Sequence, residues 1–185
     1  MAFSLQQLQD RADIEMVLIQ YCRFIDRVDL DALAALFTTD CFVEYGPDAN
    51  FSSQGRAKLR RDLERMWRYR RTAHQMSNIE VSFNGADEAH VLSSVIAWHE
   101  RPEDQNREVV LLYGRYDDTL VRTPQGWNIR RRKLMNAGGD RVFESTIFPC
   151  ERMPAPAGWA WPPQTALRST QPCARANSFH HEGRL

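Results

Sequence analysis

The sequence predicts an α+β fold, in which a strongly curved mixed or antiparallel sheet packs on three N-terminal helices as a cone-shaped barrel. Up to about residue 71, apolar residues recur at steps of three and four, which is the period of one helix face. From Ala73 onward the period changes to two, and short turn-forming stretches separate long strands. Helices followed by strands with short connections are typical of the α+β class.

The first helix is predicted from an apolar stripe that ends beside Asp26. The stripe consists of Ile14, Val17, Leu18, Tyr21, Cys22 and Ile25. Residues 30–37 predict a second, short helix, and residues 41–45 predict a strand. After a loop rich in Gly, Pro, Asn and Ser, a third helix is expected from about residue 56 to 71. Its apolar side consists of Leu59, Leu63, Met66 and Trp67.

Four strand segments follow, and each shows alternating apolar and polar residues. They are AHQMSNIEVSF from Ala73, HVLSSVIAWHE from His90, VVLLYGRYDDTLVR from Val109 and WNIRRRKLMNAGG from Trp127. A curved sheet covered by helices encloses an apolar interior, which is the usual place for a small ligand. We therefore assign residues 1–147 to the barrel domain. Residues 148–185, rich in Pro, Ala and Ser, are expected to form an extension that is partly disordered or docks on a subunit.

Charge and composition argue against several classes of partner. The 24 basic and 24 acidic residues balance, so no net field draws the chain to nucleic acid or a membrane surface. No apolar run is long enough to span a bilayer, and the chain start lacks the features of a secretion signal, so a cytoplasmic location is expected. No zinc-type spacing, phosphate loop or dinucleotide fingerprint occurs, so neither a metal nor a cofactor is expected.

The third predicted helix is strongly basic. Its basic residues are Arg56, Lys58, Arg60, Arg61, Arg65, Arg68, Arg70 and Arg71. Acidic residues interrupt the series, and it lies on the polar side of the helix, so a solvated face is favoured over a nucleic-acid site.

Asp26 and His74 are the first candidates for catalysis. Asp26 lies beside the apolar stripe and can enter a pocket, or else Asp26 or Asp29 caps the next helix. His74 begins the strand after the third helix. A carboxylate there can orient its ring and stabilise the imidazolium formed on proton abstraction. The alternative is a histidine bonded only to backbone.

Polar residues on the predicted strands supply further candidates. His99 lies on the same side of its strand as small apolar residues that are expected to face inward, so it is expected to face inward as well. The alternative is that the strand has already reached solvent at this position. Tyr45 ends its strand and can donate to a substrate oxygen, or it is a rim aromatic. Arg115 and Asp117 share a strand face, which favours an ion pair inside the pocket over a solvated strand end. Asp118 is expected to face solvent.

Three stretches resemble the SnoaL-like branch of the nuclear transport factor two-like superfamily. They are IEMVLIQYCRFIDRVDLDALAALFTTDCFVEY, TAHQMSNIEV and GRYDDTLVRTPQGWNIRRRKL, and the likeness spans about residues 5 to 136. The resemblance implies the cone-shaped fold and similarity to scytalone dehydratase and bile-acid dehydratases. The superfamily also includes a lindane dehydrochlorinase, a steroid isomerase and polyketide cyclases.

The resemblance also implies roles for individual residues. In the dehydratase-like members the positions of Asp26 and His74 form the catalytic dyad, with the histidine as the base. Tyr45 and His99 match an active-site tyrosine and histidine of scytalone dehydratase, and Tyr21 matches a tyrosine of the bile-acid dehydratases.

The sequence departs from the scytalone dehydratase pattern at three positions. Ile25 replaces the tyrosine that precedes the aspartate, and Arg115 and Asp117 stand where a serine and an asparagine occur. With Tyr21, these two residues are expected to bind substrate.

The expected function is that of a cofactor-independent lyase, similar to the dehydratases, acting on a small cyclic or aromatic hydroxy compound. The alternatives are an isomerase or polyketide-type cyclase with the same dyad, or a non-catalytic β subunit of a ring-hydroxylating dioxygenase. A homo-oligomer, either dimer or trimer, is expected because such assemblies are common in the family.

Overall fold

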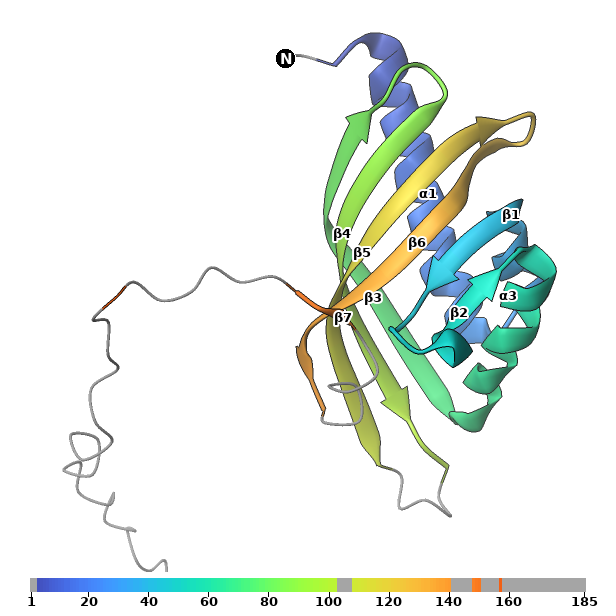
Figure 1. Cartoon of the computed structure of the whole chain (residues 1–185), viewed down its shortest axis with the longest axis vertical. Coiled ribbons are helices and arrows are strands. Elements are labelled where there is room, and N and C mark those ends of the chain that lie inside the picture. The colour runs from blue at the N-terminus through green and yellow to red at the C-terminus, as the bar shows by residue number, and fades with distance from the viewer. Residues whose placement is uncertain (1–2, 103–107, 141–147, 151–156, 158–185) are drawn as a thin grey trace, which may run out of the picture. The chain divides into compact units, whose positions relative to one another are not determined.

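A computed structural model describes residues 3–102, 108–140, 148–150 and 157 (Figure 1). The chain divides into a unit of residues Met1–Glu151 and a second unit of residues Arg152–Leu185. The description below concerns the first unit. Apart from residues 148–150 and 157, the predicted extension, including Trp159 and Trp161, lies outside the described residues.

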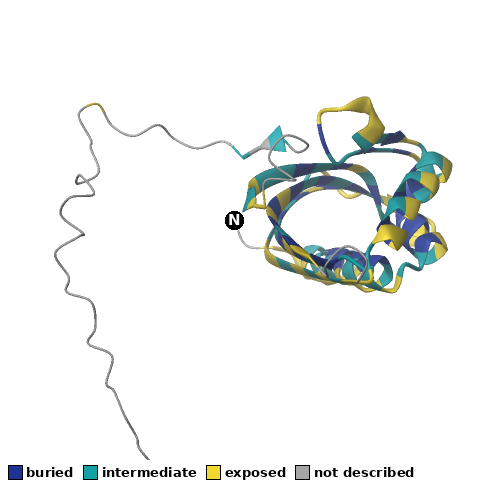
Figure 2. Ribbon diagram, turned by 90° about the horizontal axis from the view of Figure 1, so that it is seen from below, coloured by how far each residue is buried: buried dark blue, intermediate teal, exposed yellow. Residues whose placement is uncertain are grey.

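One mixed sheet forms most of the first unit (Figure 1). Its strands are β1 Phe37–Glu44, β2 Ser52–Gln54, β3 Arg71–Phe83, β4 Glu88–Glu100, β5 Val109–Thr123, β6 Gly126–Gly139 and β7 Phe148–Pro149. The order is β2-β1-β6-β5-β4-β3, and β7 pairs with β6. Strands β1 and β7 run parallel to β6, whereas all other pairs are antiparallel. The sheet curves strongly without closing (Figure 2).

Three α-helices accompany the sheet, as the hydrophobic period predicts, and the α+β cone fold is therefore confirmed. Helix α1, Leu5–Arg27, begins at a capping box in which Ser4 and Gln7 exchange hydrogen bonds. It ends where Val28 adopts a left-handed conformation with φ of 54°. Helix α2, Leu30–Ala35, is capped by the Asp29 carboxylate, which accepts a hydrogen bond from the Ala32 amide.

The third helix is shorter than the pattern predicts. Helix α3, Arg56–Asp62, continues as the 3-10 helix η2, Leu63–Arg68. A second 3-10 helix, η1, Ala49–Phe51, precedes β2. In a 3-10 helix residues three apart align, so Leu63 and Met66 both face the core. Trp67 then faces solvent and is 60% exposed, so its predicted place on the apolar side is wrong.

The core lies between α1 and the inner face of the sheet. Helix α1 packs against β3 and β6, and its predicted apolar stripe is largely buried. Fully burying a large aliphatic or aromatic side chain of this kind stabilises the fold by about 1.5–3 kcal/mol. On β5, the inward series is Val110, Leu112, Gly114, Tyr116, Asp118 and Leu120. The core therefore holds one carboxylate at the centre of the sheet.

Candidate active site

Asp26 and His74 meet where α1 ends beside the start of β3. The His74 Nδ1 atom lies 2.7 Å from Asp26 Oδ1, and the His74 backbone amide donates to Asp26 Oδ2 at 2.9 Å. The Thr72 hydroxyl donates to Asp26 Oδ1 at 2.9 Å. The residue that caps the next helix, α2, is Asp29 and not Asp26. Asp26 thus binds both the imidazole ring of His74 and the beginning of strand β3.

These contacts determine the charge state of Asp26 and the tautomer of His74. Burial alone would raise the pKa of the Asp26 carboxyl, but the hydrogen bonds from His74 and Thr72 outweigh it and lower that pKa. An ionised carboxylate only accepts hydrogen bonds, so His74 Nδ1 carries a proton. Nε2 of His74 is then the nitrogen that can take a proton from another molecule.

His74 also lines a pocket with a cavity volume of about 120 Å³ that opens to solvent. The apolar wall includes Ile25 from α1, Leu63 and Met66 from η2, and Leu112 and Leu134 from β5 and β6. The polar wall includes Tyr21, Tyr45, Tyr69, His74, His99 and Tyr116. Asp26 is not among the described lining residues, so it lies behind the histidine rather than against a ligand. The His74 side chain is only 4% exposed.

His99, on β4, faces inward beside His74. The two ring centroids lie 5.2 Å apart and the rings are perpendicular. The Tyr69 ring lies 4.6 Å from His99 on its other side. Burial, and then the proximity of His74, lower the pKa of His99 to about 4. His99 is therefore a neutral imidazole at pH 7 rather than a cation.

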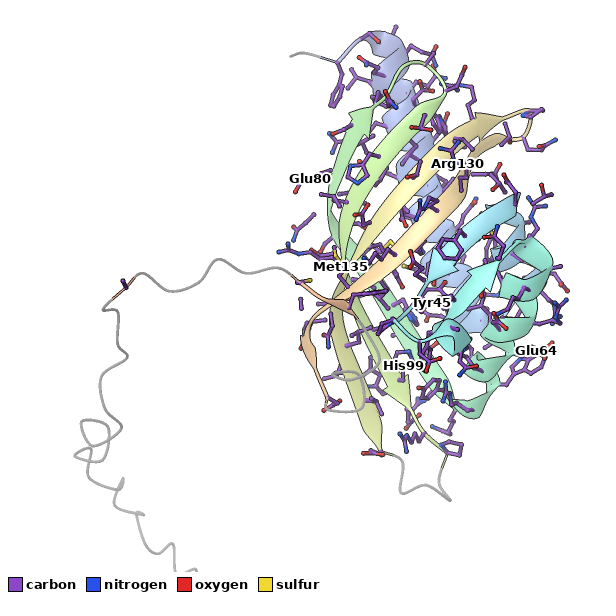
Figure 3. The ribbon with its side chains drawn as sticks, in the orientation of Figure 1. Tyr45, Glu64, Glu80, His99, Arg130 and Met135 are labelled. Carbon is purple, nitrogen blue, oxygen red and sulfur yellow. The ribbon has the colours of Figure 1, made fainter. Side chains whose placement is uncertain are left out.

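Tyr21 and Tyr45 form a pair of phenols in the same pocket. Their hydroxyl oxygens lie 3.0 Å apart. Figure 3 labels Tyr45, which follows β1, and His99 in the same region of the molecule. Burial raises the pKa of Tyr45 well above its usual range, so the phenol keeps its proton. The pair can therefore donate a hydrogen bond to an oxygen of a bound molecule.

A buried ion pair that the sequence did not predict supports these tyrosines. Arg132 Nε and Nη2 donate to the two Asp118 oxygens at 2.8 and 2.7 Å, and both side chains are fully buried. The Arg132 guanidinium lies 4.1 Å from the Tyr21 ring centroid and 4.0 Å from that of Tyr116. The expectation that Asp118 faces solvent is therefore wrong.

Arg115 and Asp117 lie on the outer face of β5, so the predicted ion pair inside the pocket is wrong. Arg115 is exposed, and Asp117 contacts His90 Nε2 at 2.7 Å. The two residues do share a face, as the alternation predicts, but that face is the outer one. The inward positions on either side of Asp117 belong to Tyr116 and Asp118.

The described residues hold neither a cluster of metal ligands nor a membrane-spanning helix. Across these segments no group of three or more His, Cys, Asp or Glu side chains is arranged to hold a metal ion. Among the described helices none combines the length and apolarity needed to cross a membrane.

The strand order, the curved sheet over three helices and the pocket between them define an α+β cone fold. The chain belongs to the SnoaL-like domain family, which matches residues 6–133. An uncharacterized protein of Mycobacterium tuberculosis is 33% identical over 135 residues, covering 70% of this chain and 86% of its own length.

Solved structures share the fold. The "Putative Scytalone Dehydratase" of Novosphingobium aromaticivorans is 33% identical, covers 80% of this chain and 98% of its own, and has a TM-score of 0.74. A "putative aromatic ring hydroxylase" of the same species is 25% identical, covers 74% and 96% of the two chains, and has a TM-score of 0.65. A type 2 hexachlorocyclohexane dehydrochlorinase is 18% identical, covers 84% and 99%, and has a TM-score of 0.66.

Proposed function

We propose that this protein is a cofactor-independent lyase that dehydrates a small cyclic or aromatic hydroxy compound. The observation that carries the proposal is the 2.7 Å contact between His74 and Asp26 in the wall of an apolar pocket. A carboxylate that is hydrogen-bonded to one nitrogen of an imidazole fixes the direction of the other nitrogen and stabilises the imidazolium formed when that nitrogen takes a proton. The similarity to the structure named as a scytalone dehydratase supports elimination of water as the reaction.

In the proposed reaction, His74 Nε2 takes a proton from the carbon next to a carbonyl or other activating group. The electrons of that C–H bond form the new double bond as the C–O bond at the neighbouring carbon breaks. Asp26 stabilises the imidazolium, which then returns its proton to the departing hydroxyl, so water leaves and the enzyme is regenerated.

Tyr45 and His99 have supporting roles in this scheme. The high pKa of Tyr45 makes a phenolate costly, so the Tyr21–Tyr45 pair polarises the substrate oxygen by hydrogen bonding without losing a proton. His99, neutral at pH 7, provides a second hydrogen-bonding group beside the base. The positioned base, His74, contributes roughly a hundred- to ten-thousand-fold in rate.

The test is a screen of hydroxylated cyclic ketones by mass spectrometry, followed by His74→Ala and Asp26→Asn. The chain offers a matched control, because His90 and Asp117 form a second His–Asp contact of 2.7 Å on the outer face. We expect products lighter by one water, an activity lost in both dyad variants, and unchanged turnover in His90→Ala. Turnover that survives both dyad changes would refute the proposal. A product of unchanged mass would instead identify an isomerase or a cyclase.

A second candidate is a non-catalytic subunit of a ring-hydroxylating dioxygenase. It is favoured by the similarity to the structure named as an aromatic ring hydroxylase. Such a subunit needs no base aimed into a pocket, so the Asp26–His74 contact supports the lyase more strongly. Purification from the native source and mass measurement of the intact complex would separate the two. A second, different chain in the complex would favour the subunit.

A further inference from the structure

Two arginines line the candidate active site, and no carboxylate does so among the described lining residues. Arg65 and Arg68 both come from η2, and they share the pocket with His74 and His99. Because residues three apart align in a 3-10 helix, the two guanidinium groups belong to the same side of η2. This side of the pocket is therefore positive, while most of the remaining wall is apolar or aromatic.

Four neighbouring basic residues in this part of the chain are paired with acidic residues. Lys58 pairs with Asp62, Arg60 pairs with Asp31 and Glu64, and Arg70 and Arg71 both pair with Glu100. In the described part of the chain, Arg65 and Arg68 form no ion pair within 4.0 Å. Arg61 also forms none there, but it is exposed on α3 outside this pocket.

The contacts of Arg65 show that part of its role is structural. Its Nη2 donates to the Asn50 carbonyl at 3.2 Å, and its guanidinium lies 5.4 Å from the Phe51 ring centroid. Its Nε donates to the Asp62 carbonyl, and its charge also lowers the pKa of the Asp62 carboxyl. Arg65 therefore ties η1 to η2 and adds positive charge at this edge of the pocket.

Arg68 has more donors available. Its Nε donates to the Arg65 carbonyl at 3.0 Å, and its guanidinium lies 5.3 Å from the Tyr69 ring centroid. The same Tyr69 ring contacts His99, which in turn lies against His74. Arg68 is exposed, so it stands at the mouth of the pocket with its two Nη groups directed to no acceptor within the described residues.

We infer that the substrate carries an anionic group, a carboxylate or a phosphate, which Arg68 binds at the pocket mouth while the reacting carbon reaches His74. Arg65 strengthens the field at that position. A guanidinium recognises carboxylates and phosphates through charge-assisted hydrogen bonds. The inference rests on the proposed function for the position of the reacting carbon. It narrows the substrate to an anionic cyclic or aromatic hydroxy compound.

The test compares three probes with one aromatic body: 2-naphthoate, 2-naphthyl phosphate and the neutral methyl 2-naphthoate. Isothermal titration calorimetry gives the Kd of each for the full chain and for Arg68→Gln, Arg65→Gln and Arg61→Gln. We expect at least one anion to bind about tenfold more tightly than the neutral ester, as a charge-assisted hydrogen bond provides. This preference should shrink as salt is added. The anion that binds more tightly distinguishes a carboxylate from a phosphate.

The three arginine variants show which residue is responsible for the preference for an anion over the neutral ester. Arg68→Gln should reduce the preference to about twofold or less, Arg65→Gln should reduce it in part, and Arg61→Gln should leave it unchanged. Equal binding of ester and anions by the unaltered chain would overturn the inference, and so would a preference that persists in Arg68→Gln.

The same measurement separates this inference from the proposed elimination. Binding needs no turnover, so His74→Ala should keep the preference for an anion even though it is inactive. A preference lost in His74→Ala and retained in Arg68→Gln would assign the anion to the histidine and overturn the role of Arg68. Failure of the elimination would appear only in the turnover screen.

Discussion

The buried pair of Asp118 and Arg132 allows a direct test of how much an ion pair inside the sheet contributes to stability. Both side chains are fully buried, and they are joined by two hydrogen bonds of 2.8 and 2.7 Å. Asp118→Asn keeps the shape but removes the negative charge, which leaves Arg132 as an uncompensated cation away from water. Breaking a buried pair in this way costs about 3–5 kcal/mol. For a domain of this size, that corresponds to a fall of about 6–20 °C in Tm.

The neighbouring residue provides the control for this experiment. Asp117 has the same side chain on the same strand, but its side chain is 43% exposed, and its oxygen lies 2.7 Å from Nε2 of the half-exposed His90. Asp117→Asn should change stability by no more than about 0.5 kcal/mol. Urea unfolding followed by circular dichroism measures both variants. If Asp118→Asn lies within about 1 kcal/mol of Asp117→Asn, the argument that a buried charge needs its partner fails here.

Two further predictions concern pH and packing. Because the folded pKa of His99 is near 4 and its ordinary value is 6.5, the unfolded chain binds an extra proton between these values. Stability should therefore fall as pH falls through this window, and less so in His99→Phe; unfolding free energies measured across the window test this. In Gly114→Ala, the new Cβ would lie 2.9 Å from the Met135 carbonyl oxygen, so unfolding should require about 1–3 kcal/mol less.

Each of these predictions has an outcome that contradicts it. Parallel pH profiles for the unaltered chain and His99→Phe would show that another group accounts for the acid sensitivity. The effect of Asp26 on stability can be distinguished from that of His99 by its pH range. Because the pKa of Asp26 is lowered in the folded chain, its contribution to stability is lost only below its ordinary pKa of 3.8. An unchanged free energy of unfolding in Gly114→Ala would mean that β6 can move away from β5 at that point.

The order of helices and strands could be predicted because both periods are plain in the sequence. The apolar stripe that ends at Asp26 predicted the buried face of α1. The alternating pattern that begins just before His74 predicted the strand β3. The inner face of β5 was harder, because its outer face is also apolar. Val109 and Tyr113 are 43% and 46% exposed, yet they resemble core residues in sequence. The alternation alone therefore places Arg115 and Asp117 in the pocket, whereas they lie on the outer face of β5.

Arg132 was missed for a different reason, which is an irregularity in the sheet. The pairing of β5 with β6 shifts between Thr119 and Leu120, so Ile129 and Arg132 both point inward although they are three residues apart. Strict alternation from Ile129 would place Arg131 inside instead. Arg65 and Arg68 are three residues apart, and they align more closely in the 3-10 helix η2 than they would in an α-helix.

Within the described segments, the hydrogen bonds that hold Asp26 come from Thr72 and His74, both on β3. The apolar wall of the pocket is built largely by other elements, including Leu112 on β5 and Leu134 on β6. Substitutions in that wall can therefore reshape the volume offered to a ligand and leave the orientation of the imidazole unaltered. The same separation would let descendants of this chain acquire new substrates while inheriting one chemistry, and it gives a protein engineer a wall that can be varied independently of the base.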